Sequence, residues 1–391
     1  MKLLINMKAE LCRKSRNGLI TRAENNRRKN QINRQVNNAK HKYSVEKFCA
    51  YKNDMKKSWS LLNHLMGRNK SKQEIVRILD GNAEFTEAHD IANKFADYFS
   101  NVGVNLENNL SQTDVSPTTH IDSNPHSFYL FPATYDECLN VISNLKLTKT
   151  SLNQIPVSIF KRVKDIICAP LMKLINASFK HGIFPSSMKL ARVTPVYKKI
   201  DPKFCSNYRP ISSLPYVSKI YERLMTNRII SFFNKHSLFS EKQYGFLKGR
   251  STQGALMNLT ENIYDALDVY EHNISILIDL KSAFDTVNHS ILLSKLSLYG
   301  IRGVPLNWIK SYLSDRRFYV SLNGSSSSEK ILNIGIPQGS ILEPLFFINY
   351  NNELPKVSNI LTTTLFADDT TFSISNNNYE NMKSILNKEL K

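Results

Sequence analysis

Alternation of apolar and polar positions predicts strands in the second half of the chain. The run from Ile274 to Ile278 is typical of a buried strand and ends at Asp279. Residues 365–374, LFADDTTFSI, predict a strand, a tight turn that carries Asp368 and Asp369, and a returning strand. Residues 191–215 contain β-branched positions on both sides of a polar loop and predict a strand-loop-strand unit.

Helical spacing of apolar positions predicts helices elsewhere in the chain. Residues 86–103 are expected to form an amphipathic helix that Gly103 closes. Thr134 and Glu137 have the spacing of a capping box at the start of another helix. Gly300 is expected at the C-terminal end of the helix in residues 288–300. Residues 104–128, between the helix at 86–103 and the capping box at Thr134, are polar, contain two prolines and are interpreted as a linker.

Basic residues are concentrated at the beginning of the chain. Of the formal net charge of +19, residues 1–73 carry +15, with 19 Lys and Arg against 4 Asp and Glu. A basic segment this dense favours a polyanion, and we interpret residues 1–73 as a helical arm along a nucleic-acid backbone. A solvated helical face without a partner is an equally good reading of any single residue here. The candidates for phosphate contacts are Arg27, Arg28, Lys29 and Arg34.

The remaining composition indicates a soluble, intracellular protein. Five cysteines are widely spread and form no C-x-x-C pair, which favours a reducing compartment and argues against a zinc site. No apolar run is long enough to cross a bilayer, and the first residues lack the apolar stretch of a signal peptide. At 391 residues the chain is long enough for two or three domains.

The three acidic residues at strand ends are the strongest candidate for chemistry. Taken alone, an Asp-Asp pair is usually a solvated turn, and a single Asp after a strand is often a helix cap. Here Asp279, Asp368 and Asp369 all end or interrupt apolar strands, where uncompensated carboxylates are costly. Together they predict a site for hard divalent metal ions of the kind used in phosphoryl or nucleotidyl transfer.

Five ordered motifs carry a resemblance to a known family. From about Ala191 to the C-terminus the chain resembles the reverse transcriptase domain of non-LTR (LINE-type) retrotransposons, among them the insect Jockey-like elements. Residues 74–190 are also similar to the segment that precedes this domain. The motifs are NYRPISSLP, QYGFLKGRST, IDLKSAFDTVNHSILLSKL, GIPQGSILEPLFFINYNNELP and LFADDTT.

The resemblance implies an α+β fold of the right-hand polymerase type. Helices and a β-hairpin would form fingers in residues 129–262, after a helix and polar linker in 74–128, and an RRM-like palm would occupy 263–391. The chain is expected to be C-terminally truncated, with an incomplete palm and without a thumb, and the basic helical extension of residues 1–73 would precede these domains.

The resemblance also implies roles for single residues. Asp279, Asp368 and Asp369 would be catalytic and would hold two Mg²⁺ ions, with Mn²⁺ as a substitute. Asp285 also belongs to the family pattern, but we interpret it as a cap of the following helix. The nucleotide-binding residues would be Lys198, Arg209, Phe284, Gln338 and Gly339, and Lys248 and Arg250 would join the nucleic-acid-binding set.

Two of these assignments have an alternative. Phe284 would exclude a ribose 2′-hydroxyl, but it could equally be a core aromatic. Lys198 and Arg209 would contact a triphosphate, although surface basic residues on a hairpin are the more common case.

The implied reaction is RNA-directed DNA synthesis. A primer 3′-hydroxyl would attack the α-phosphate of a dNTP on an RNA template, with one metal ion lowering the pKa of the hydroxyl and the other holding pyrophosphate. The partners would be an RNA template, a DNA primer and dNTPs, without a membrane. The family further implies a ribonucleoprotein in the nucleus and cytoplasm.

Several positions depart from the family pattern. Glu343 stands where the family has Gly, which adds bulk and charge beside the expected nucleotide pocket, and Asn352-Glu353 replaces the usual Asn-Asp. These departures and the expected truncation leave an alternative function open, a catalytically inactive remnant that retains RNA binding. A maturase-like intron reverse transcriptase is a weaker alternative.

Overall fold

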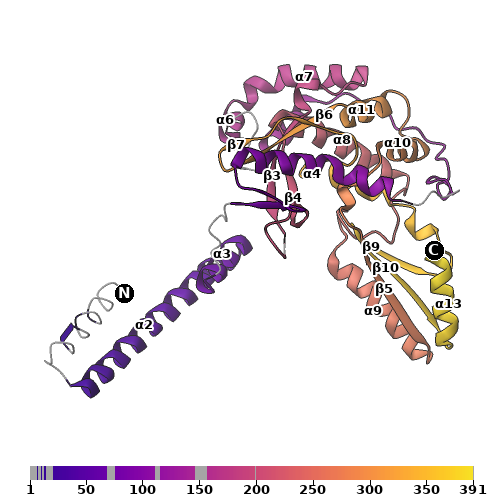
Figure 1. The fold of residues 1–391 in the computed structure, drawn as a ribbon. Coiled ribbons are helices and arrows are strands. Elements are labelled where there is room, and N and C mark those ends of the chain that lie inside the picture. The colour runs from indigo at the N-terminus through magenta and orange to yellow at the C-terminus, as the bar shows by residue number, and fades with distance from the viewer. Residues whose placement is uncertain are drawn as a thin grey trace. The chain divides into compact units, whose positions relative to one another are not determined.

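The computed structural model describes residues 7, 10, 13, 14, 21–67, 75–110, 115–145, 156–198 and 200–390 (Figure 1). By its internal contacts the chain divides into two compact units, Met1–Glu74 and Ile75–Lys391. The boundary expected between residues 73 and 74 lies outside the described residues. The boundaries expected within the second unit stay predictions.

Two helices lie between residues 21 and 67 of the first unit. Helix α2, Arg22–Ala50, begins at Thr21, whose side chain accepts the N–H of Glu24. Helix α3, Met55–Leu65, follows after the N-cap Asp54. The prediction of a basic helix here is confirmed for α2. Because α2 is polar on nearly all sides, it does not have the apolar stripe by which a helix packs on a core.

One sheet of the second unit contains the predicted strand-loop-strand. Strands β3, Leu190–Tyr197, and β4, Tyr208–Ser213, pair antiparallel, and β3 also pairs in parallel with β6, Arg316–Leu322. The order is β4-β3-β6-β7, with β7 at Ser325–Ser326 and β8, Lys330–Leu332, also paired to β6. Helix α4, Ala88–Asn108, packs against this sheet and buries Phe95 and Phe99 there. Strands β1, Ile78–Asp80, and β2, Ala83–Phe85, form a small antiparallel hairpin around Gly81.

A second, three-stranded sheet contains the acidic residues. Its order is β5-β10-β9, formed by His272–Asp279, Asp369–Asn376 and Thr362–Phe366. Alternate residues of β5 and β10 pack with Met382 and Leu386 of α13, Tyr379–Glu389. Helix α9, Thr252–Asp268, contacts β5 and β9, and Figure 1 shows it beside these strands.

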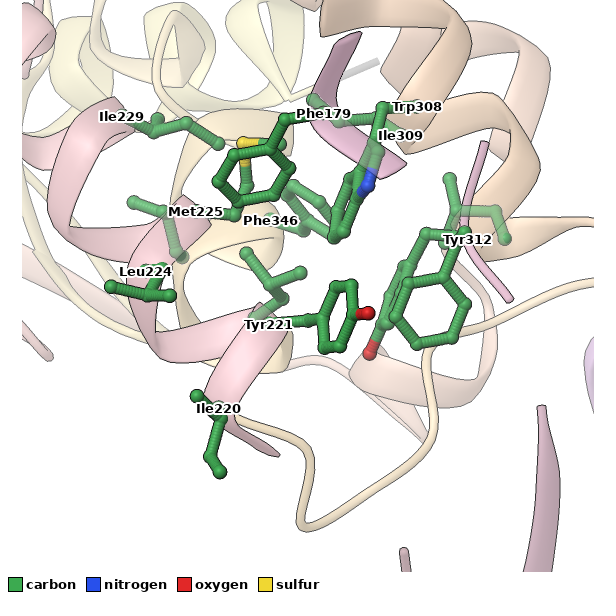
Figure 2. Close-up of a cluster of buried hydrophobic side chains, with 14 of the residues drawn as sticks. Phe179, Ile220, Tyr221, Leu224, Met225, Ile229, Trp308, Ile309, Tyr312 and Phe346 are labelled. Carbon is green, nitrogen blue, oxygen red and sulfur yellow. The ribbon is translucent and has the colours of Figure 1, made fainter. Parts of the chain in front are cut away.

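The largest core cluster lies among helices. It is formed by α5 (Tyr135–Ser143), α6 (Val157–Arg162), α7 (Lys164–His181), α8 (Tyr216–Lys235), α10 (His289–Leu298), α11 (Val304–Leu313) and α12 (Glu343–Tyr350). Figure 2 shows aromatic rings from several of these helices meeting in one place. Trp308 and Tyr312 stack with their ring centres 5.8 Å apart. The capping box of Thr134 and Glu137 at the start of α5 is confirmed.

Gly103 does not end its helix as expected. It is buried within α4, which continues to Asn108. A β-carbon at this position would lie 2.3 Å from the backbone oxygen of Asp285. The glycine therefore serves a close approach between α4 and the loop after β5. Gly300 follows α10 with a φ of +106°, which confirms the glycine expected at that end.

The described part of the second unit is thus an α+β fold of three sheets, the small β1–β2 hairpin among them, and surrounding helices. Among the described residues no helix is both long and apolar enough to span a membrane.

Candidate active site

Asp279 and Asp369 face each other across two antiparallel strands. Asp279 is the last residue of β5 and Asp369 the first of β10, and the two are register partners. Partners in an antiparallel pair place their side chains on the same face of the sheet, with β-carbons about 5 Å apart. The turn between β9 and β10 holds Ala367 and Asp368, so the third acid is adjacent in sequence. The predicted hairpin and the predicted strand end therefore meet at one end of one sheet.

The carboxylates of Asp279, Asp368 and Asp369 repel one another because they carry like charges close together. Burial raises the pKa of Asp369, and the neighbouring carboxylates of Asp368 and Asp279 raise this pKa further. Both Asp279 and Asp369 are exposed, so a cation can reach them from solvent. A divalent cation between these carboxylates would relieve the repulsion.

The donor chemistry of the acids fits the metal that the sequence predicts. Carboxylate oxygens are the ligands that Mg²⁺ prefers, usually one or two with water and substrate phosphate completing the shell. Among the described residues, however, no three His, Cys, Asp or Glu side chains are already placed to hold an ion. Asp279 and Asp369 are register partners, and Asp368 lies next to Asp369 in the turn.

The loop that begins the QYGFLKGRST motif holds the acidic turn, a role that the sequence did not indicate. Leu365 of β9 exchanges backbone hydrogen bonds with the segment of residues 242–244. The buried side chain of Gln243 accepts hydrogen bonds through Oε1 from the backbone N–H groups of Gly245 and Ala367. A β-carbon on Gly245 would lie 2.5 Å from the nitrogen of Ala367. Only Gly at that position lets the loop come so close to the turn.

Lys198 and Arg209 lie on one exposed face of the β3–β4 hairpin. Arg209 pairs with Val196, and the N–H of Lys198 bonds the carbonyl of Asn207. Because side chains alternate along strands, Lys198 and Arg209 point to the same side. Both side chains are exposed. This arrangement suits a polyanionic ligand.

Phe284 lies between the core and the loop that holds the acidic turn. It belongs to the short 3-10 segment η3, Ala283–Asp285, and is half-buried. Its ring centre lies 4.6 Å from that of Phe347 in α12 and 6.4 Å from that of Phe246. Both readings of Phe284 stay open, because the ring has a core contact on one side and an exposed aromatic on the other.

Gln338 and Gly339 lie in a turn that is bonded to β4. The carbonyl of Gln338 accepts the N–H of Ser212 at 2.7 Å, and Gly339 has a φ of +102°. The N–H of Gly339 donates to Glu343 Oε2 at 2.5 Å. Glu343, where the family pattern has Gly, thus occupies a backbone donor of the predicted nucleotide pocket. Burial raises the pKa of Glu343 to about 7.

Asp285 is not the helix cap that we expected. Helix α10 is capped by Asn288, whose side chain accepts the N–H groups of Ser290 and Ile291. The carboxylate of Asp285 instead accepts hydrogen bonds from Gln338 Nε2. Burial raises the pKa of Asp285 to about 6. The family motif that contains residues 283–285 pointed to Asp285 as a residue of interest. It did not indicate that the hydrogen-bond partner of Asp285 is Gln338, 53 residues away.

The basic residues of the predicted nucleic-acid-binding set have different surroundings. Lys248 is exposed, whereas Arg250 is half-buried and donates from Nη1 to the carbonyls of Ser240 and Gln243. Arg250 thus has a structural contact that the sequence did not indicate. On α2, Arg28 pairs with Glu24 at 2.6 Å. Arg27 and Arg34 are exposed and Lys29 is half-buried.

Contacts connect the acids to the predicted nucleotide-binding residues. The turn at Ala367 bonds Gln243 and touches Gly245. Next in sequence, Phe246 contacts Phe284. The carbonyl of Phe284 accepts the N–H of Ile336, just before Gln338. These contacts form a continuous path from the acidic turn to the segment before Gln338 within the second unit.

Comparison with known proteins defines the class of this site. Residues 197–390 match the family described as reverse transcriptase (RNA-dependent DNA polymerase). This range contains strands β5 and β10 with the acids, the turn of Gln338, and Arg209. The second unit therefore contains a reverse transcriptase domain.

Individual relatives narrow the family further. The chain is 32% identical over 232 residues to the probable RNA-directed DNA polymerase from transposon BS of Drosophila melanogaster, covering 57% of this chain and 25% of the relative. It is 33% identical over 224 residues to that of transposon X-element, with 52% and 24% covered, and 29% identical over 254 residues to that of the mobile element jockey, with 62% and 28% covered. Over this region the chain is similar to the RNA-directed DNA polymerases of Drosophila transposable elements, jockey among them. The matches span about a quarter of the length of these relatives.

Proposed function

We propose that this chain is an RNA-directed DNA polymerase that transfers nucleotides from dNTPs to a primer 3′-hydroxyl. The observation that carries the proposal is the pairing of Asp279 with Asp369 at the end of β5 and β10, with Asp368 in the adjoining turn. The family match and the names of the relatives support the same reaction.

The elements of the second unit would correspond to the subdomains of a right-hand polymerase. The β3–β4 hairpin and its helices would act as fingers, and the three-stranded sheet with α13 would be the palm. The contacts that run from the acidic turn through Gln243, Phe246 and Phe284 toward the Gln338 turn support this division.

The chain's own residues would bind and orient the reactants. Lys198 and Arg209 would neutralise the triphosphate, since both are exposed cations on one face. Phe284 would exclude a 2′-hydroxyl from the sugar position. Mg²⁺, when held by Asp279, Asp368 and Asp369, would stabilise charge on the reacting oxygens. Positioning and charge neutralisation would account for most of the rate.

The proposed partners are an RNA template, a DNA primer and dNTPs, within a ribonucleoprotein in the nucleus and cytoplasm. The high positive charge of residues 1–73 supports a polyanionic partner.

Primer extension on an RNA template in the presence of Mg²⁺ tests the proposal. We expect the full chain to extend the primer with dNTPs, and Asp279→Asn or Asp369→Asn to lower the rate by at least about a thousandfold, as when groups that stabilise charge in the transition state are removed. Asp268→Asn, at the exposed end of α9, is the matched control and should leave the rate unchanged. Equal extension by the Asp369→Asn variant and the wild type would contradict the proposal.

A second candidate function is RNA binding without polymerisation. The contact of Glu343 Oε2 with the N–H of Gly339 favours it, because the half-buried Glu343 side chain occupies a donor of the proposed nucleotide pocket. Glu343→Gly frees this donor and should increase the extension rate, whereas Glu343→Gln keeps the bulk and should not. Salt-sensitive RNA binding with no extension by either variant would favour the second candidate.

A further inference from the structure

We propose that Asp285 is a positioning residue that fixes the Gln338 carboxamide for recognition of the incoming nucleotide. This inference rests on the proposed polymerase function and deepens it, because it assigns a role in nucleotide binding to a residue outside the three acids. The role is exerted through Gln338 and involves no contact between Asp285 and the nucleotide.

The contact between the two side chains has a defined polarity. Gln338 Nε2 donates to Asp285 Oδ1 at 2.9 Å and to Oδ2 at 3.0 Å. An ionised carboxylate only accepts hydrogen bonds, so the nitrogen end of the amide must face it. The Oε1 of Gln338 is then the end of the amide that is left to accept a hydrogen bond from a hydroxyl or base N–H of the nucleotide. A charge-assisted bond of this kind is stronger than one between neutral groups.

Hydrogen bonds hold the backbone at Gln338 and at Gly335, three residues before it. Its carbonyl accepts the N–H of Ser212 in β4. Gly335 donates to the carbonyl of Val287 at 2.9 Å, and its own carbonyl bonds His289 Nε2 at 2.7 Å. Side-chain rotation is therefore the main freedom that Gln338 retains, and Asp285 removes it.

Two glycines bring the loop of Asp285 to the Gln338 turn. A β-carbon on Gly335 would lie 2.8 to 2.9 Å from backbone atoms of Asp285, and one on Gly103 would lie 2.3 Å from its oxygen. The loop is thus packed between α4 and the segment that leads to Gln338.

Without Asp285 the side-chain amide of Gln338 could bond to Arg316 instead. Asp285, Gln338 and Arg316 border a small pocket of about 30 Å³. Arg316 is buried, and its Nε and Nη2 have no hydrogen-bond partner in the described part of the chain. These donors would attract Gln338 Oε1 away from the nucleotide if Asp285 no longer held Nε2. The anionic Asp285 prevents this rotation.

Equilibrium dNTP binding tests the inference without needing turnover. The full chain is loaded with an RNA–DNA template–primer in Ca²⁺, and a fluorescent dNTP is titrated for the wild type, Asp285→Asn, Gln338→Ala and the double variant. We expect each single variant to bind the dNTP about tenfold more weakly, the loss expected when one hydrogen-bonding group loses its position. The double variant should be no weaker than Gln338→Ala, and template–primer affinity should stay unchanged.

The controls separate this role from a purely structural one. Asp122→Asn makes the same change at a fully exposed side chain and should have no effect. Gln338→Glu leaves Asp285 intact but places two acids together, and it should bind dNTP more weakly than Gln338→Ala. If Asp285→Asn does not fold, the dNTP affinity of Gln338→Glu still tests the role of Asp285.

Three outcomes would overturn the inference. They are unchanged dNTP binding by Asp285→Asn, losses that multiply in the double variant, and wild-type affinity in Gln338→Glu. A wild type that binds no dNTP would contradict the proposed function as well. A wild type that binds dNTP while Asp285→Asn has no effect would contradict only this inference.

Discussion

The side-chain oxygen of Gln243 accepts a hydrogen bond of 3.0 Å from the backbone N–H of Ala367, the residue before Asp368. Ala367 has a φ of +58°, a left-handed backbone conformation that residues other than Gly rarely adopt. The same oxygen accepts the N–H of Gly245 at 2.8 Å. Gln243 therefore joins the loop to the acidic turn and stabilises a conformation that would otherwise be costly.

Gln243→Ala should lower primer extension without unfolding the protein. Loss of the oxygen leaves the buried N–H of Ala367 without its partner, at a cost of about 1–3 kcal/mol, and frees the turn that carries Asp368. We expect the extension rate to fall by about ten- to a hundredfold, as when a catalytic group is displaced by about 1 Å. Gln253→Ala, on the exposed face of α9, is the control. Full activity of Gln243→Ala would show that the turn does not need this support.

Glu343 should make stability depend on pH. Its pKa is raised to about 7 from 4.5, so the folded state binds the proton more tightly than the unfolded state. The free energy of unfolding should therefore fall as the pH rises from about 4.5 to about 7. Asp285, with its pKa raised to about 6, acts in the same direction at the lower end of this range.

Urea denaturation across this pH range measures the contribution of Glu343. The variant Glu343→Gln should show a smaller decrease in unfolding free energy than the wild type. Glu261→Gln, on the exposed part of α9, should follow the wild-type curve. Identical pH dependence in the wild type and Glu343→Gln would mean that the pKa of the Glu343 carboxyl is not raised in the folded state.

The buried ion pair of Lys295 and Glu353 should be costly to break. Both side chains are almost fully buried, and Lys295 Nζ also donates to the carbonyl of Tyr350 at 2.6 Å. Glu353→Ala leaves an unpaired buried ammonium group and should lower the free energy of unfolding by about 3–5 kcal/mol. Breaking the exposed pair of Arg317 and Glu329 with Glu329→Ala should cost less than about 1 kcal/mol. Equal losses in both variants, measured by urea denaturation, would contradict this ranking.

RNA affinity should depend on salt through the first unit. If Arg27, Lys29 and Arg34 contact phosphates, replacing all three by Ala should reduce the slope of log affinity against log salt by about 2, since each phosphate contact on a single strand contributes about 0.7. Three exposed lysines of the second unit, Lys235, Lys310 and Lys383, serve as the control set. An unchanged slope in the Arg27, Lys29 and Arg34 variant would remove the basis for an RNA-binding arm.

Local patterns in the sequence predicted the elements that carry the acids. The apolar run before Asp279 and the β-forming residues around Asp368 gave strands and a hairpin that the structure confirms. Turn and cap signals at Thr134 and Gly300 were also confirmed, because they depend on neighbouring residues alone.

Long-range contacts explain what local patterns missed. Gly103 was expected to end a helix, but its role is set by the approach of Asp285, far along the chain. Asp285 was expected to cap α10, but its partner is Gln338. The support of the acidic turn by Gln243 depends on a pairing between segments 124 residues apart. Such contacts follow from packing, which spacing along the sequence does not reveal.

The most direct test of the central claim is a Mn²⁺ titration of the full chain, followed by electron paramagnetic resonance, with Mn²⁺ in place of Mg²⁺. If Asp279 and Asp369 hold the ion together, the wild type should bind Mn²⁺, and Asp279→Asn and Asp369→Asn should each weaken this binding by at least about tenfold, a loss of about 1.4 kcal/mol. Asp268→Asn should bind as the wild type does. Wild-type Mn²⁺ affinity in both Asp279→Asn and Asp369→Asn would contradict the account.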